Sequence, residues 1–186
     1  MKLGEDGEIL VKGPNVFLGY YKEPEATAES LRDGFLCSGD LGAFDEQGFL
    51  SITGRKKEII ITAGGKNIAP KNIEAAIKQS PLVGEAVVIG DRRKFLTMLV
   101  TLDEAAARKV VPDGDLATSA EVRKLVQAQL DRVNESLARV EQVKKFAILP
   151  RPFGIDTGEL TPTMKIKRKV VAQRYAKEID AMYLEE

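Results

Sequence analysis

The chain has 186 residues, of which 44% are hydrophobic and 30% charged, so it suits one large or two small globular domains. It lacks the run of about 18 apolar residues that a membrane helix needs. With no histidine and one cysteine, Cys37, it offers no imidazole base, disulfide framework or zinc cluster. Its 28 basic and 28 acidic residues cancel, which argues against a general nucleic-acid binder. Because no secretory signal opens the chain, we expect a cytoplasmic protein and leave peripheral contact with a membrane open.

The first third of the chain predicts β structure, because 11 of the 16 glycines fall within residues 1–65. Strand or hairpin is predicted for residues 8–12, 34–39 and 41–52. The hairpin is expected to turn at residues 45–48. Three such segments leave sheet edges unpaired, which a complete domain would cover. We therefore expect residues 1–55 to be the β-rich end of a larger N-terminal domain.

Residues 56–186 alternate helical and strand patterns. Helices are predicted from Pro70, over residues 119–139 and over residues 166–184. Strands are predicted over residues 85–90, 95–102 and 144–149, with a hairpin turn at residues 91–94. Together these elements predict a small α+β domain with a short sheet and packed helices.

Two polar motifs in the first third are candidates for binding a sugar or an anion. A short strand that ends in Ser-Gly-Asp would leave the Asp40 carboxylate at a loop, where it can accept hydrogen bonds from a diol such as ribose. An ordinary turn is the alternative, and these residues alone favour it. Further on, Arg55, Lys56 and Lys57 could clamp a phosphate, and Arg55 suits this best because a guanidinium binds two oxygens at once. A solvated start of a strand explains the same three cations equally well.

Two further motifs lie in the predicted α+β domain. Gly64 and Gly65 form a glycine loop before a helix, which permits close approach of a ligand to the backbone. They are not part of a P-loop, because Lys66 is followed by Asn rather than Ser or Thr. Lys165 follows a polar loop and is a mobile point charge that could bridge a carboxylate and a phosphate. The alternative is a basic helix start, which the helix dipole mildly disfavours. No metal ligands are predicted.

The order and spacing of these motifs resemble the C-terminal part of the AMP-forming acyl-CoA synthetases, within the adenylate-forming superfamily. The resemblance runs from residue 4 to about residue 170. It comprises the segment that closes the large N-terminal domain, an Asp-Gly-aromatic motif, the hinge with its glycine loop, and the C-terminal lysine motif, at residues 7–27, 33–40, 54–74 and 161–168.

The resemblance implies a role for each motif. Asp40 would hold the ribose hydroxyls of ATP, and Arg55 would contact the ribose and phosphate of the nucleotide. Lys57 would fall at the hinge about which the C-terminal domain rotates, a position where the family often has Asp. Gly64 and Gly65 would lie beside the channel for the pantetheine arm of coenzyme A.

Catalysis is implied for Lys165, which would reach between the substrate carboxylate and the α-phosphate of ATP. The implied reaction joins a fatty acid to coenzyme A through an acyl-adenylate, and uses ATP with Mg²⁺. Met164 stands where the family often has Gly, and the run Leu-Thr-Pro-Thr-Met-Lys resembles the long-chain fatty acyl branch. The phosphate loop and acyl pocket would lie in the missing N-terminal domain, so we expect the chain alone to be inactive. A non-catalytic interaction module of the same fold, or an enzyme that loads a carrier protein, are the alternatives.

Overall fold

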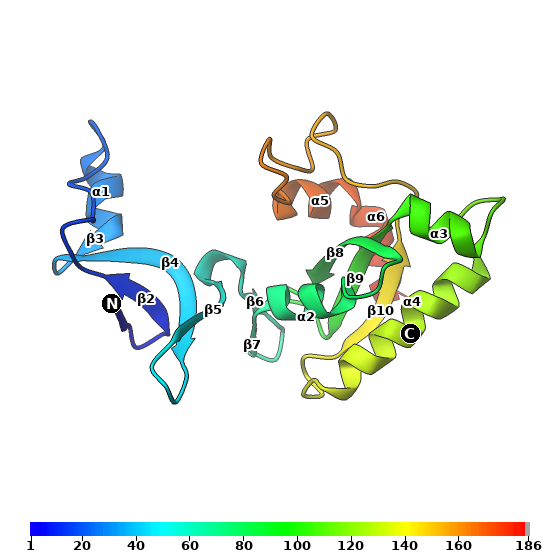
Figure 1. Cartoon of the computed structure of the whole chain (residues 1–186), viewed down its shortest axis with the longest axis horizontal. Coiled ribbons are helices and arrows are strands. Elements are labelled where there is room, and N and C mark those ends of the chain that lie inside the picture. The colour runs from blue at the N-terminus through cyan, green and yellow to red at the C-terminus, as the bar shows by residue number, and fades with distance from the viewer. Residues whose placement is uncertain (185–186) are drawn as a thin grey trace. The chain divides into compact units, whose positions relative to one another are not determined.

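A computed structural model describes residues 1–184 and divides the chain into two compact units, Met1–Ile59 and Ile60–Glu186 (Figure 1). The division lies four residues beyond the boundary expected from the sequence. Each unit has its own sheet, and both hydrophobic clusters of the described residues lie in the second unit. Within residues 1–184, no helix is both long enough and apolar enough to cross a membrane.

The first unit is an antiparallel sheet with the strand order β1-β2-β4-β3, and β5 pairs with β4. Its elements are β1 Lys2–Leu3, β2 Glu8–Val11, α1 Pro24–Ser30, β3 Leu31–Arg32, β4 Phe35–Phe44, β5 Leu50–Arg55 and the 3-10 turn η1 Lys56–Glu58. The predicted hairpin is confirmed: β4 and β5 turn at residues 45–48, where Gly48 has a φ of 84°. Such left-handed backbone favours glycine.

Strand β4 does not end at Asp40, as the sequence suggested, and that prediction was wrong. Leu10 of β2 pairs with Cys37 and Glu8 pairs with Leu41, so two steps along β2 correspond to four along β4. Residues 38–40 therefore bulge from the β2 side while β4 continues. The backbone can take this path because Gly39 has a φ of 73°.

The second unit is built on the sheet β10-β9-β8, in which β8 is antiparallel and β10 parallel to the central strand β9. A separate two-stranded ladder precedes it. The elements are β6 Ile60–Ile61, β7 Asn67–Ile68, α2 Pro70–Ile77, β8 Val83–Ile89, β9 Leu96–Leu102, α3 Glu104–Val110, α4 Ala120–Glu135, β10 Val143–Ile148, α5 Arg168–Arg174 and α6 Ala176–Leu184. The predicted α+β class is confirmed, and the sequence patterns missed α3.

Side chains of β9 alternate between two hydrophobic clusters, one on each face of the sheet. Met98 and Val100 belong to the cluster with α2 and α4. Leu99 belongs to the cluster with α5 and α6. The sheet is therefore covered by helices on both faces, and every residue of β9 is buried.

Helix α4 follows the predicted pattern, because its buried residues recur at helical spacing: Val122, Val126, Leu130 and Val133. The Ser119 side chain accepts a hydrogen bond from the Val122 amide and caps the helix start. The last predicted helix, residues 166–184, is corrected to two helices. They are separated at Tyr175, which has a φ of −102° and a ψ of 30° and whose hydroxyl bonds to Glu159.

Two leucines of α4 test how the helix is anchored to the sheet. Leu130 is 1% exposed and Leu125 is 40% exposed. Leu130→Ala should lower the free energy of unfolding by about 2–4 kcal/mol, because it leaves a cavity in the core. Leu125→Ala should cost less than about 1 kcal/mol. Urea denaturation followed by circular dichroism measures both, and equal losses would contradict the packing described here.

Candidate functional site

Asp40 and Arg55 lie opposite each other on neighbouring strands, β4 and β5. Arg55 Nε donates to Asp40 Oδ1 at 2.7 Å, and the hydrogen bond and charge of Asp40 raise the pKa of Arg55. The Arg55 and Asp40 side chains are 57% and 27% exposed. The structure therefore brings together the two residues that the sequence assigned to a nucleotide, and leaves both open to solvent.

Glu8 binds the residues next to this pair, Gly39 and Lys56, and no sequence pattern pointed to it. Its buried carboxylate accepts hydrogen bonds from the Gly39 amide at 2.9 Å and from Lys56 Nζ at 3.0 Å. Hydrogen bonds with Asp6 and Glu8 raise the pKa of Lys56. Glu8 thus ties the bulge of β4 to the segment that follows Arg55.

Several of these residues line a groove on the first unit. It is lined in part by Ser38, Gly39, Arg55 and Lys57. Lys57, the predicted hinge residue, lies in η1, two residues before the boundary between the units. Within residues 1–184, no three or more Cys, Asp or Glu side chains gather so as to hold a metal ion.

Gly64 and Gly65 form the turn between β6 and β7, so a short strand separates them from the helix that was expected to follow directly. The Gly65 amide donates to the Thr62 carbonyl at 2.8 Å, and Gly65 has a φ of 75°. A side chain at Gly64 would find its nearest neighbour, Thr62 Oγ1, at 3.9 Å, and one at Gly65 would meet nothing within 4 Å. The turn is therefore open, as close approach of a ligand requires.

Lys165 lies on a hydrogen-bonded turn and not at a helix start, which was the alternative considered from the sequence. The Thr161 amide donates to the Lys165 carbonyl at 2.8 Å, and the Lys165 amide donates to Thr161 Oγ1 at 3.0 Å. Leu160 and Ile166 form a β-bridge on either side, and α5 begins only at Arg168. We call residues 159–167 the lysine turn.

Met164 has left-handed backbone, with a φ of 61°, directly before Lys165. A glycine adopts this conformation freely, whereas other residues pay about 1–2 kcal/mol. This backbone conformation gives a physical reason for the Gly that is often found at this position in the family that the sequence resembles. It also shows that the Met164 side chain, 64% exposed, is not needed for packing.

Glu159 begins the lysine turn and is completely buried. Burial alone would raise its pKa, but hydrogen bonds lower the pKa of Glu159 from 4.5 to about 2, so it is ionised at neutral pH. The hydrogen bonds that lower it come from the side chains of Arg151, Thr157 and Tyr175 and the amide of Gly154, and Arg174 donates as well. No local pattern singles out Glu159, because these partners are spread over residues 151–175.

The other end of the lysine turn is tied to α2. Arg168 Nη2 donates to Glu74 Oε2, and Glu74 Oε1 accepts the Val88 amide of the edge strand β8 at 2.7 Å. Glu74 is buried and follows the glycine turn along the chain. An ion pair therefore connects the segment after Lys165 with the helix after Gly64 and Gly65.

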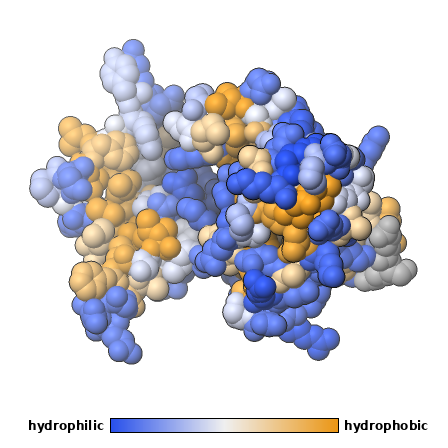
Figure 2. Space-filling model, turned by 45° about the vertical axis from the view of Figure 1, so that its right-hand side comes forward, coloured by the Kyte–Doolittle hydropathy of each residue, from blue (hydrophilic) through white to orange (hydrophobic). Residues whose placement is uncertain are grey.

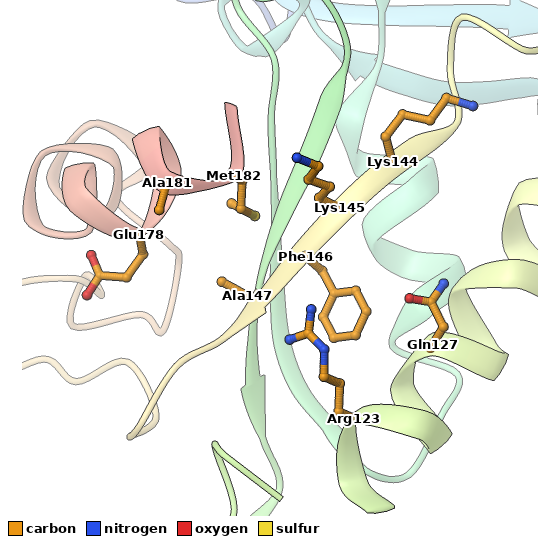
Figure 3. A pocket seen from close by; sticks show the side chains of 9 residues that line it. All are labelled: Arg123, Gln127, Lys144, Lys145, Phe146, Ala147, Glu178, Ala181 and Met182. Carbon is orange, nitrogen blue, oxygen red and sulfur yellow. The ribbon is translucent and has the colours of Figure 1, made fainter. Parts of the chain in front are cut away.

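A second groove runs along the outer edge of β10, between α4 and α6 (Figure 3). The guanidinium of Arg123 lies over the ring of Phe146, 4.7 Å from its centre. Met182 and Ala181 of α6 border the other side. None of the residues predicted from the sequence lines this groove.

The second unit is thus an α+β domain in which helices cover both faces of the sheet and a turn outside the sheet carries the exposed Lys165. The AMP-binding enzyme C-terminal domain family matches residues 57–186, and the chain belongs to this family. The predicted family is therefore confirmed.

Curated relatives are similar to this chain over all or nearly all of its length. Long-chain-fatty-acid–CoA ligase FadD15 of Mycobacterium tuberculosis is 46% identical over 195 residues, which cover 100% of this chain and 32% of the relative. Long-chain-fatty-acid–CoA ligase ACSBG2 of Xenopus laevis is 43% identical over 204 residues, which cover 95% of this chain and 28% of the relative. The chain spans about a third of the length of these relatives.

Solved structures support the same fold. The adenylation domain of a carboxylate reductase from Mycobacterium chelonae matches with a TM-score of 0.82 and 28% identity, over 96% of this chain and 28% of that one. The A domain of a carboxylic acid reductase from Segniliparus rugosus, in complex with AMP and a co-purified carboxylic acid, matches with a TM-score of 0.81 and 30% identity over the same shares.

Met164 allows a test of the backbone at the lysine turn. Met164→Ile should lower the free energy of unfolding by about 1 kcal/mol, because a β-branched residue tolerates left-handed backbone least. Met164→Asn should leave it unchanged or raise it, because Asn accepts this conformation. Urea denaturation compares the two variants. If both lose the same stability, the side chain of Met164 matters and its backbone does not.

Proposed function

We propose that this chain is the C-terminal part of an AMP-forming long-chain fatty acid–CoA ligase. The lysine turn carries the proposal, because it holds Lys165 exposed on a defined backbone in a chain whose relatives are named as such ligases. The reaction has two halves. A fatty acid carboxylate attacks the α-phosphorus of ATP and pyrophosphate leaves, and the thiol of coenzyme A then attacks the acyl carbon and releases AMP.

In the first half, Lys165 bridges the fatty acid carboxylate and the α-phosphate. Negative charge accumulates on the phosphate oxygens as the new bond forms, and an ammonium group placed there stabilises the transition state more than the ground state. A well-placed donor of this kind is worth about 3 kcal/mol, or 100-fold in rate. A fixed turn suits this role, since the group need not be reorganised during the reaction.

Asp40 and Arg55 bind the nucleotide in this proposal. A carboxylate only accepts hydrogen bonds at neutral pH, which fits the two hydroxyls of a ribose. The guanidinium of Arg55, held by Asp40 at 2.7 Å, keeps further donors for a phosphate oxygen. Mg²⁺ would enter bound to the phosphates of ATP, and we assign it no ligand in this chain.

In the second half, Gly64 and Gly65 border the path of the pantetheine arm, because the open turn lets a narrow ligand pass along the backbone. Lys57 serves as the hinge about which the second unit turns between the two half-reactions. Its place just before the boundary between the units supports this role.

The rest of the N-terminal domain supplies the phosphate loop and the acyl pocket. Apolar side chains on the surface of the first unit support this part of the proposal (Figure 2). Phe49 and Ile52 are 67% and 63% exposed, and a missing partner surface would cover them. The chain alone is therefore expected to be inactive. We place the intact enzyme in the cytoplasm, with peripheral membrane contact as a further outcome to test.

Transfer to a carrier protein is the second candidate for the second half-reaction. It is favoured by the A-PCP didomain of the Segniliparus rugosus carboxylic acid reductase, which matches with a TM-score of 0.80. The higher identity to the CoA ligases, 46% against 30%, favours coenzyme A as the acceptor. Offering the acyl-adenylate to each thiol in turn separates the two candidates.

Lys165→Ala tests the first half-reaction in the full-length parent enzyme. Pyrophosphate release with a long-chain fatty acid should fall 100-fold or more, since the charge at the α-phosphate is lost. Transfer from presynthesised acyl-adenylate to coenzyme A should stay within about twofold. Lys169→Ala, which removes an exposed lysine of α5, is the matched control. Equal pyrophosphate release by Lys165→Ala and wild type would remove the proposed role.

Gly64→Leu tests the second half-reaction. Gly64 is the better choice because Gly65 has a φ of 75°, so a side chain there would strain the turn itself. Leucine at Gly64 should slow transfer to coenzyme A about tenfold or more by obstructing the channel, and should leave pyrophosphate release within about twofold. Gly64→Ala should give a smaller loss of the same kind. An equal loss in both half-reactions would contradict the assignment.

A further inference from the structure

We propose that Glu159 is a positioning residue for Lys165, and that its buried carboxylate fixes the lysine turn in the geometry that the first half-reaction requires. The inference rests on the role proposed above for Lys165. Glu159 has no exposed surface, so it acts through the turn and not by contact with a substrate.

The carboxylate of Glu159 holds together three separate parts of the second unit. Arg151, which follows β10, donates to both oxygens at 3.0 and 2.7 Å. From α5 and the break after it, Arg174 Nη1 and the Tyr175 hydroxyl donate to Oε1 at 3.2 and 3.1 Å. From the intervening loop, the Gly154 amide and Thr157 Oγ1 donate to Oε2 at 3.1 and 2.5 Å.

The backbone of Glu159 carries this anchoring to Lys165. The Glu159 carbonyl accepts the Lys167 amide at 2.7 Å, and the bridge between Leu160 and Ile166 is the next step toward the tip. The side chain is thus bound to the segment after β10 and to α5, while the main chain of the same residue pairs with Lys167 at the end of the turn. A shift of Glu159 therefore displaces both arms that hold Lys165.

A fully buried carboxylate is a costly way to stabilise a loop. Removing an ion from water is recovered only when its partners are complete, and apolar residues of similar size often stabilise a fold as well or better. What the paired hydrogen bonds from Arg151 add is a fixed orientation of the carboxylate, because a guanidinium can bind both oxygens in one orientation only. This favours a role in fixing geometry over a role in stability alone.

Glu159→Gln in the full-length parent enzyme tests the inference. The amide keeps the size of the side chain but turns an NH₂ group toward donors, so the turn should loosen. Pyrophosphate release at saturating ATP should fall roughly 10- to 100-fold, because a displacement of about 1 Å has this effect on a positioned group. The KM for ATP and transfer from presynthesised acyl-adenylate should stay within about twofold. Asp156→Asn, which neutralises an exposed carboxylate of the same loop, should behave as wild type.

A double-mutant cycle distinguishes positioning from a general loss of structure. If Glu159 acts through Lys165, Glu159→Gln with Lys165→Ala should be no slower than Lys165→Ala alone. If the two substitutions instead slow pyrophosphate release by independent factors that multiply in the double variant, the inference is overturned. Should Glu159→Gln fail to fold, Thr157→Val removes one donor and should show a smaller loss with the same pattern.

Hydrogen exchange of residues 159–167 gives a readout without catalysis. Exchange there should become about tenfold faster in Glu159→Gln and stay unchanged in α2 and α4, and unchanged exchange of the turn would overturn the inference. Faster exchange with normal pyrophosphate release, while Lys165→Ala is inactive, would also overturn it. Normal release by Lys165→Ala would instead reject the proposed role of Lys165, and with it the catalytic purpose of the anchoring.

Discussion

The complete burial of β9 is the constraint on which the second unit depends. All seven residues of this strand are buried, because it lies between β8 and β10 and has side chains on both faces. Such a strand is stable only if helices cover each face, and α2 with α4 and α5 with α6 do so. The residues proposed for chemistry lie outside this core: Gly64 and Gly65 in the turn of the separate β6–β7 ladder, and Lys165 in the turn before α5.

Two buried carboxylates bind the segments on either side of Lys165. Glu74 satisfies the Val88 amide of the edge strand β8 and pairs with Arg168, and Glu159 gathers the loop that leads to Lys165. A buried charge without partners would be costly, so each of them constrains everything it contacts. The lysine is thus held from both sides by charged contacts, although its own side chain is exposed.

Local patterns in the sequence predicted what depends on neighbouring residues. The stripe of α4 and the hairpin turn at Gly48 follow from spacing and turn chemistry, and the motif around Lys165 was recognisable by its order. The bulge at Gly39 was missed because its partner, Glu8, is 31 residues away. The break at Tyr175 depends on Glu159 in the same way. These two corrections therefore lie where a buried carboxylate binds groups that are distant in the sequence.

The proposed rotation of the second unit requires that Lys165 move together with the rest of that unit as one rigid body. Its cores on the two faces of the sheet are formed within residues 60–184, and the anchors of the lysine turn belong to the same unit. A rotation about Lys57 would then withdraw Lys165 and bring up the glycine turn without breaking either buried ion pair. Because both buried carboxylates find their partners within the second unit, the proposed rotation would leave the lysine turn intact.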